Sequence, residues 1–115
     1  MRALIVDDHP SFRRCARALL TEEGFEVVGE AETGSEAVAL AAELGPELVL
    51  LDIQLPDFDG FEVARRLLAS EGDLRIVLVS SRDAGDYGAL IRTSGALGFV
   101  AKSDLSGDTL RSLLG

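Results

Sequence analysis

The sequence of 115 residues is poor in cysteine, in positive charge and in long apolar runs. Cys15 is its single cysteine, which excludes an internal disulfide and a zinc site built from several cysteines. A lone thiol suits the reducing cytoplasm, where we expect the protein to act. No run approaches the roughly 18 apolar residues of a membrane-spanning helix. The chain also turns acidic at Asp7, too early for a signal peptide.

Positive charge is scarce because 11 Lys and Arg residues face 20 Asp and Glu residues, for a formal net charge of −9. A chain this acidic is repelled by nucleic-acid phosphates and lacks the basic patch that docks on anionic lipid. We therefore expect no direct contact with nucleic acid or membrane. No repeat or Pro/Ser-rich linker divides the chain, so residues 1–115 are expected to form one domain, without an output domain.

Short apolar runs alternate with helical patterns along the chain. The apolar runs predict five buried strands, at residues 3–6, 26–31, 48–52, 75–80 and 98–101. The second run is more polar than the others, so we expect it at an edge of the sheet. Capping patterns and apolar residues spaced three and four apart predict helices over residues 11–23, 33–44, 59–68, 83–93 and 104–114.

This alternation predicts a doubly wound α/β domain, in which a parallel five-stranded sheet lies between two layers of helices. The first helix carries one apolar stripe, made of Phe12, Cys15, Ala16, Leu19 and Leu20. The cysteine is therefore expected in the core. Gly85 and Gly88 each weaken the fourth helix by about 1 kcal/mol, so we expect that segment to be the most mobile.

Polar residues stand at the ends of four of the five apolar runs. They are, in chain order, Asp7 and Asp8, Asp52, Ser80 and Lys102. The carboxyl ends of parallel strands lie on one edge of a sheet, with neighbouring strands about 4.8 Å apart. We therefore expect these side chains to meet in one crevice.

Three carboxylates in one crevice repel each other, so the crevice must raise their pKa values or bind a cation. Oxygen ligands with room for water favour Mg²⁺, and Lys102 adds a fixed positive charge. An aspartate beside Mg²⁺ and a lysine is well placed to attack phosphorus, and a serine hydroxyl can donate to a phosphoryl oxygen. The pattern predicts an acyl-phosphate site with Asp52 as the covalent acceptor.

In its motifs and their spacing, the whole chain resembles the receiver domain of two-component response regulators, and most of all the NarL/FixJ subfamily. The resemblance rests on residues 4–10, 50–56 with 59–60, 79–80 and 95–102. It implies the flavodoxin-like receiver fold with strand order 2-1-3-4-5. It also implies a metal site, in which Asp7 and Asp8 bind Mg²⁺ directly or through water. Asp52 and the backbone carbonyl of Gln54 would complete that site.

The resemblance further implies how the phosphoryl group is held. Asp52 would accept it, Ser80 and Lys102 would contact it, and Phe99 would be the aromatic switch residue that turns inward as Ser80 moves. Two departures stand out. Ser103 replaces the proline that often follows the lysine after a cis peptide bond, and Phe99 lacks the hydroxyl of a tyrosine switch.

The function that the resemblance implies is a phosphorylation-activated signalling switch. A sensor histidine kinase would be the phosphodonor, and a second phosphorylated copy would be a partner in a homodimer. Phosphorylation would shift the face built by the fourth helix, fifth strand and fifth helix, and so control an output domain or partner. The domain would assist its own phosphorylation and dephosphorylation rather than act as a classical enzyme.

Other interpretations compete with this one. A receiver-fold module that signals through dimer contacts without phosphorylation is the main alternative, although the complete set of acids, serine and lysine argues against it. A phosphatase of the haloacid-dehalogenase type needs a second Asp where Gln54 stands. A calcium loop at residues 57–60 fails because Leu55 and Arg66 occupy ligand positions. His9 is expected at the surface rather than as a metal ligand.

Overall fold

The computed structural model describes residues 1–70, 73–82 and 84–115. Its centre is a parallel sheet of five strands in the order β2-β1-β3-β4-β5, which confirms the predicted topology. The strands are β1 (Arg2–Val6), β2 (Glu26–Ala31), β3 (Leu48–Asp52), β4 (Arg75–Ser80) and β5 (Gly98–Ala101). The helices are α1 (Pro10–Glu22), α2 (Gly34–Leu44), α3 (Gly60–Ser70), α4 (Ala89–Thr93) and α5 (Gly107–Leu114).

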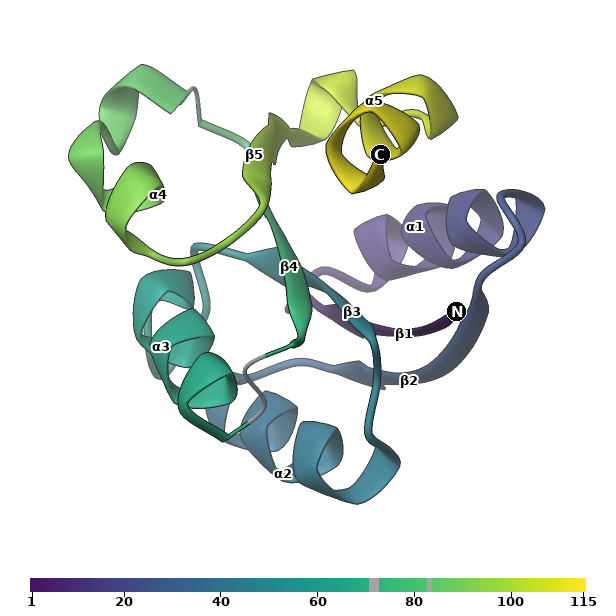
Figure 1. The fold of residues 1–115 in the computed structure, drawn as a ribbon, viewed down its shortest axis with the longest axis horizontal. Coiled ribbons are helices and arrows are strands. Elements are labelled where there is room, and N and C mark those ends of the chain that lie inside the picture. Colours follow the sequence, from purple (N-terminus) through teal and green to yellow (C-terminus); the bar gives the residue numbers. More distant parts are fainter. Residues whose placement is uncertain (71–72, 83) are drawn as a thin grey trace.

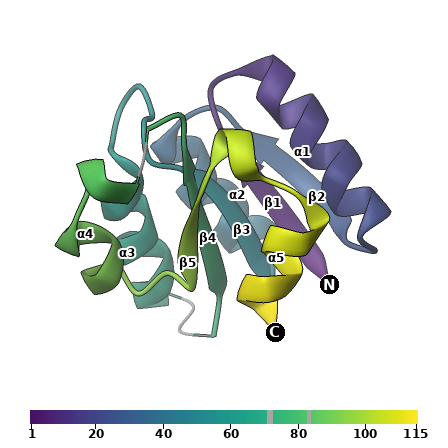
Figure 2. The same ribbon diagram turned by 90° about the horizontal axis from the view of Figure 1, so that it is seen from above.

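The helices form a layer on each face of the sheet. Helices α1 and α5 lie on one face, whereas α2 and α3 cover the other, with α4 beside α3 (Figures 1 and 2). Alternate residues of each central strand point into two apolar cores, one under each layer. All five residues of β3 are buried, as expected of a central strand, and β2 lies at an edge as predicted.

Two predicted helices differ from those in the structure. The fourth is reduced to a 3₁₀ turn (Ala84–Asp86) and the five-residue α4, and Asp83, its predicted first residue, lies outside the described residues. The fifth begins at Gly107 instead of Asp104, because the Ser106 hydroxyl caps it by accepting a hydrogen bond from the Thr109 amide at 3.2 Å. Residues Lys102–Asp104 form a 3₁₀ turn instead.

The prediction that Cys15 lies in the core is wrong, because its side chain is exposed. The buried face of α1 runs through Arg13, Ala16 and Leu20, which places Cys15 on the outer side. Arg13 is only 9% exposed, and its guanidinium donates to the Asp7 backbone carbonyl at 2.6 Å. A polar anchor thus sets the rotation of the helix, which the apolar spacing alone does not reveal. In the described part of the chain, every helix is too short or too polar to cross a bilayer.

Candidate functional site

Strand pairing brings the predicted site residues to one edge of the sheet. Val6 pairs with Leu51, so the next residues, Asp7 and Asp52, are neighbours on adjacent strands. Further along the sheet, Ser80 pairs with Ala101, the residue before Lys102. The predicted acids, serine and lysine therefore share the carboxyl edge, where open α/β sheets hold their ligands.

Lys102 makes the central ion pairs of this edge. Its Nζ atom lies 2.7 Å from Asp7 Oδ2 and 3.4 Å from Asp52 Oδ2. The same ammonium lies over the ring of Phe12, 4.5 Å from the ring centroid. Asp7 and Asp52 are fully buried, so without this cation two carboxylates would face each other in a region of low dielectric.

The acids form a cluster that fits a divalent cation. Asp7, Asp8, His9 and Asp52 each offer a ligand atom, and these atoms lie within 4.8 Å of one another. Asp7 Oδ2 is buried and, among the described residues, accepts no hydrogen bond, although Lys102 lies close to it. A buried carboxylate oxygen without a hydrogen-bond donor is suited to ligate a hard cation such as Mg²⁺. The residues present thus fit the predicted metal.

His9 lies at the rim of this cluster. As expected it is exposed, with 63% of its side chain accessible, yet its Nδ1 atom is 3.0 Å from Asp7 Oδ1 and 3.1 Å from Asp8 Oδ1. The backbone amide of His9 also donates to Asp7 Oδ1 at 2.7 Å. One oxygen of Asp7 is therefore held by His9, and the other faces Lys102.

The pKa of Asp52 is raised from its ordinary value of 3.8 to about 6. Burial is the main cause, because it disfavours the charged form, and the nearby Asp7 carboxylate acts in the same direction. The Gln54 amide, which donates to Asp52 Oδ1 at 3.1 Å, and the Lys102 ammonium oppose the shift. The folded chain thus disfavours the charged form of the Asp52 carboxylate, although this carboxylate is still mostly ionised at neutral pH.

Gln54 and Ser103 follow Asp52 and Lys102 along the chain, and the sequence makes a prediction about each of them. Gln54 is exposed, two residues beyond Asp52, and the metal-binding role of its backbone carbonyl stays a prediction. The described residues contain no cis peptide bond, so the Lys102–Ser103 bond is trans. Ser103 therefore departs in conformation as well as in sequence from the proline pattern.

Ser80 is fully buried, but its hydroxyl is engaged away from the acid cluster. The Ser80 Oγ atom lies 2.7 Å from the hydroxyl of Tyr87 and accepts a hydrogen bond from the Arg82 amide at 3.1 Å. Phe99 is half-buried, and its ring centroid lies 5.9 Å from that of Tyr87. The switch roles of Ser80 and Phe99 stay predictions.

Sequence reasoning missed Tyr87. It lies between the 3₁₀ turn and α4, in the segment for which the sequence predicts a continuous weak helix. The available signal was its type, because Tyr87 is the only tyrosine of the chain and follows Ser80 by seven residues in a polar, glycine-containing stretch. Without coordinates, nothing fixes whether that stretch folds back over Ser80.

The loop after Asp52 is tied to two helices. The carboxylate of Asp57 accepts hydrogen bonds from the Gly34 amide at 2.7 Å and the Ser35 amide at 3.0 Å, at the start of α2. These donors, the Ser35 amide first, hold the pKa of Asp57 well below its usual range. Asp59 Oδ1 accepts from the Glu62 amide at 2.9 Å and caps α3, as its spacing predicts. The segment is thus a turn that is tied to the start of α2 and caps α3.

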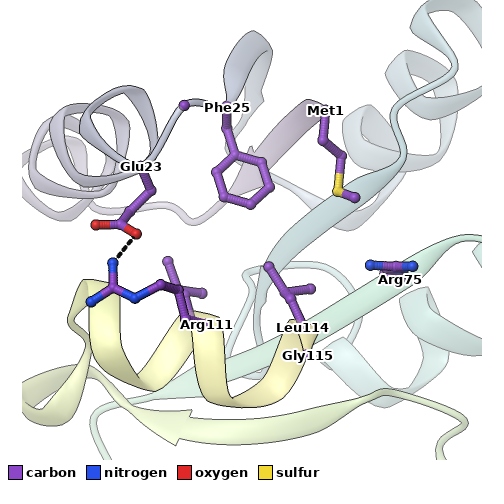
Figure 3. Close-up of a pocket in the computed structure, with 9 residues that line it drawn as sticks. Met1, Glu23, Phe25, Arg75, Arg111, Leu114 and Gly115 are labelled. Carbon is purple, nitrogen blue, oxygen red and sulfur yellow. Dashed lines mark hydrogen bonds and ion pairs between the residues drawn. The ribbon is translucent and has the colours of Figure 1, made fainter.

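A separate cavity of about 460 Å³ opens near the N-terminal ends of β2 and β4, at the opposite edge of the sheet. Figure 3 shows Phe25, Met1 and Leu114 around it, and the ion pair between Glu23 and Arg111 at its side. This ion pair joins the end of α1 to α5. The cavity contains no residue of the acid cluster and is not part of the candidate site.

Comparisons with known proteins agree with this geometry. The family model of the response regulator receiver domain matches residues 3–114. The virulence-factor transcription regulator BvgA of Bordetella pertussis is 40% identical over 103 residues, which cover 90% of this chain and 49% of BvgA. The response regulator GacA of Pseudomonas aeruginosa is 35% identical over 103 residues, covering 89% of this chain and 48% of GacA. The chain thus spans about half the length of these curated relatives.

Solved structures give the same assignment. The signal receiver domain of the response regulator NarL from Mycobacterium tuberculosis is 33% identical, with a TM-score of 0.81 over 99% of this chain and 96% of that one. A LuxR-family two-component response regulator from Aurantimonas sp. SI85-9A1 is 32% identical, with a TM-score of 0.86 over 96% of this chain and 79% of that one. With a carboxyl-edge acid cluster and a family match over nearly its whole length, the chain belongs to the response regulator receiver domain family.

Proposed function

We propose that this receiver domain is a signalling switch that is activated by phosphorylation of Asp52. The observation that carries the proposal is the buried carboxylate of Asp52, held between a second buried acid, Asp7, and the ammonium of Lys102. A sensor histidine kinase would supply the phosphoryl group. An Asp52 oxygen attacks phosphorus and forms a P–O bond as the P–N bond to the donor histidine breaks, and the electron pair of that bond stays on the histidine nitrogen.

Mg²⁺ is the cofactor that the acid cluster suits. Asp7, Asp8 and Asp52 would hold it through their carboxylates, and Gln54 through its backbone carbonyl. When bound, Mg²⁺ supplies positive charge that stabilises the oxygens of the transferring phosphoryl group. The buried Asp7 Oδ2 atom supports this assignment, because it accepts no hydrogen bond from the described residues and shares the Lys102 ammonium, 2.7 Å away, with Asp52.

Lys102 and Ser80 are the groups that would contact the phosphoryl group on Asp52. Lys102 would pair with a phosphoryl oxygen, and Ser80 would donate its hydroxyl proton to another. Phe99, the aromatic residue of β5, would move with Ser80. The shifted face of α4, β5 and α5 would then act on an output domain or on a second copy of the chain. The relatives named as transcription regulators support an output of that kind.

Labelling with a small phosphodonor tests the acceptor. Incubation with phosphoramidate and Mg²⁺ is expected to add one phosphoryl group to the wild-type chain, detected by mass spectrometry. Asp52→Asn should abolish the adduct, because the amide is not a nucleophile of this kind. Asp104→Asn is the matched control, since Asp104 is exposed and close in sequence to Lys102, and it should be labelled like wild type.

Persistent labelling of the Asp52→Asn variant would show that another residue accepts the group. A wild-type chain that takes no label and binds no Mg²⁺ would favour the alternative, a receiver-fold module that signals through contacts alone.

A further inference from the structure

The hydroxyl of Ser80 is bound to groups that lie after β4 and not to the acid cluster. Its Oγ atom is 2.7 Å from the Tyr87 hydroxyl and 3.1 Å from the Arg82 amide nitrogen. Ser80 is fully buried, so water does not replace either partner easily. In this state, the two hydrogen-bond partners of the Ser80 hydroxyl both lie in the segment between β4 and α4.

A serine hydroxyl has one proton to donate and two lone pairs to accept with. The Arg82 amide uses one lone pair of Ser80. The Tyr87 hydroxyl takes either the second lone pair or the proton itself. The two bonds compete where Ser80 donates to Tyr87, because a phosphoryl oxygen on Asp52 needs that same proton, and this is the arrangement that the inference takes.

The ring of Tyr87 is held by two other aromatic residues. Its centroid lies 5.7 Å from that of Phe61 on α3, in an edge-on arrangement, and 5.9 Å from that of Phe99 on β5. Phe99 has no hydroxyl, so within this aromatic group only Tyr87 bonds to Ser80. Tyr87 therefore connects the hydroxyl of Ser80 to α3, to β5 and to the start of α4.

We propose that Tyr87 is a positioning residue that holds the Ser80 hydroxyl in the resting state and competes for it with a phosphoryl group on Asp52. The inference rests on the proposed function, in which Ser80 donates to that phosphoryl group. A charged phosphoryl oxygen is the stronger acceptor, so phosphorylation releases Tyr87. Coupling is reciprocal, so the bond to Tyr87 in turn weakens binding of the phosphoryl group.

The test uses Tyr87→Phe, which removes the hydroxyl and keeps the ring between Phe61 and Phe99. Beryllofluoride with Mg²⁺ serves as the phosphoryl probe, and calorimetry measures its affinity for the intact chain. Without the competing bond, Tyr87→Phe is expected to bind the probe roughly two- to tenfold more tightly than wild type, the range that one net hydrogen bond gives.

A double-mutant cycle with Ser80→Ala separates competition from a general packing effect. Once Ser80→Ala has removed the shared hydroxyl, adding Tyr87→Phe should leave the affinity for the probe unchanged. If Tyr87→Phe has the same effect with and without Ser80, the substitution acts through packing and the proposal is overturned. Unchanged or weaker binding by Tyr87→Phe alone overturns it as well, and weaker binding would make Tyr87 a supporting donor.

The wild-type chain provides an independent signal. Tyr87 is its only tyrosine and it has no tryptophan, so its tyrosine emission reports on this residue alone. Beryllofluoride with Mg²⁺ is expected to change this emission, and the change should be absent in Asp52→Asn. Suppose that beryllofluoride binds only when Asp52 is present, leaves the tyrosine emission unchanged, and binds wild type and Tyr87→Phe with equal affinity. Only this inference then fails. If the wild-type chain binds no probe, the proposed function fails too.

Discussion

At the scale of single residues, Asp52 is kept at a cost to stability. Its pKa is about 6 in the folded chain against an ordinary value of 3.8, so the folded state binds the proton more tightly than the unfolded state does. The stability that this proton gives is fully present below pH 3.8 and is lost as the pH rises through about 6. Above about pH 6, the buried Asp52 carboxylate is ionised in the metal-free folded state, and this charge lowers the stability of the fold.

Replacing Asp52 by Asn should therefore stabilise the metal-free chain at pH 8. The shift corresponds to at most about 3 kcal/mol in the free energy of unfolding, and the gain should vanish below about pH 3, where Asp52 is mostly protonated in both states. Urea unfolding in EDTA at both pH values measures it, with Asp104→Asn as the control. A variant that is less stable than wild type at pH 8 would contradict the assigned pKa.

At the scale of elements, α3 begins directly against the backbone at the end of β3. A Cβ atom added to Gly60 would lie 2.6 Å from the Asp52 carbonyl oxygen and 2.6 Å from Ile53 Cα, both backbone atoms. The Gly60 amide also donates to the Ile53 carbonyl at 2.7 Å. Only glycine allows this approach, so the identity of one residue sets the distance between α3 and the end of β3.

Gly60→Ala should destabilise the fold by about 1–3 kcal/mol, because backbone must move to admit the methyl group. It should also slow phosphoramidate labelling, since the displaced backbone carries Asp52. The matched control is Gly85→Ala, where the added Cβ meets nothing within 4 Å, and where a change below about 0.5 kcal/mol is expected. Equal effects of the two substitutions on unfolding would show that the close contact is not what requires glycine at position 60.

Some features of the strands, helices and candidate site follow from local sequence patterns, whereas others depend on contacts between residues far apart in the chain. The strands and the carboxyl-edge residues were predictable because apolar runs and the polar residues that end them are local, and parallel topology then aligns them. Cys15 was misplaced because an ion-paired and hydrogen-bonded arginine, Arg13, sets the rotation of α1. The contact between Tyr87 and Ser80 was missed because it depends on how an irregular segment folds back, which no periodic pattern encodes.

At the scale of the whole molecule, 20 acidic residues against 11 basic ones leave a charge that opposes compaction. Most of these acids are in water, where salt of any kind screens them. Asp7 and Asp52 are different because they are buried and share one lysine, so bulk salt reaches them poorly. The stabilisation by a cation bound at the acid cluster should therefore be distinguishable from the stabilisation by general screening of the surface charges.

Mg²⁺ should raise the melting temperature of the chain more than NaCl of equal ionic strength. At a concentration 100 times its Kd, a ligand of the folded state adds about 2.7 kcal/mol, or roughly 10 °C for a domain of this size. Asp8→Asn should reduce this shift, whereas Asp108→Asn, the same charge change at a side chain that is 92% exposed, should leave it intact. Equal shifts with both salts, or in both variants, would mean that Mg²⁺ only screens the surface. A shift that depends on Asp8 would assign the stabilisation to the carboxyl edge of the sheet, because there the fold buries two acids with a single cation.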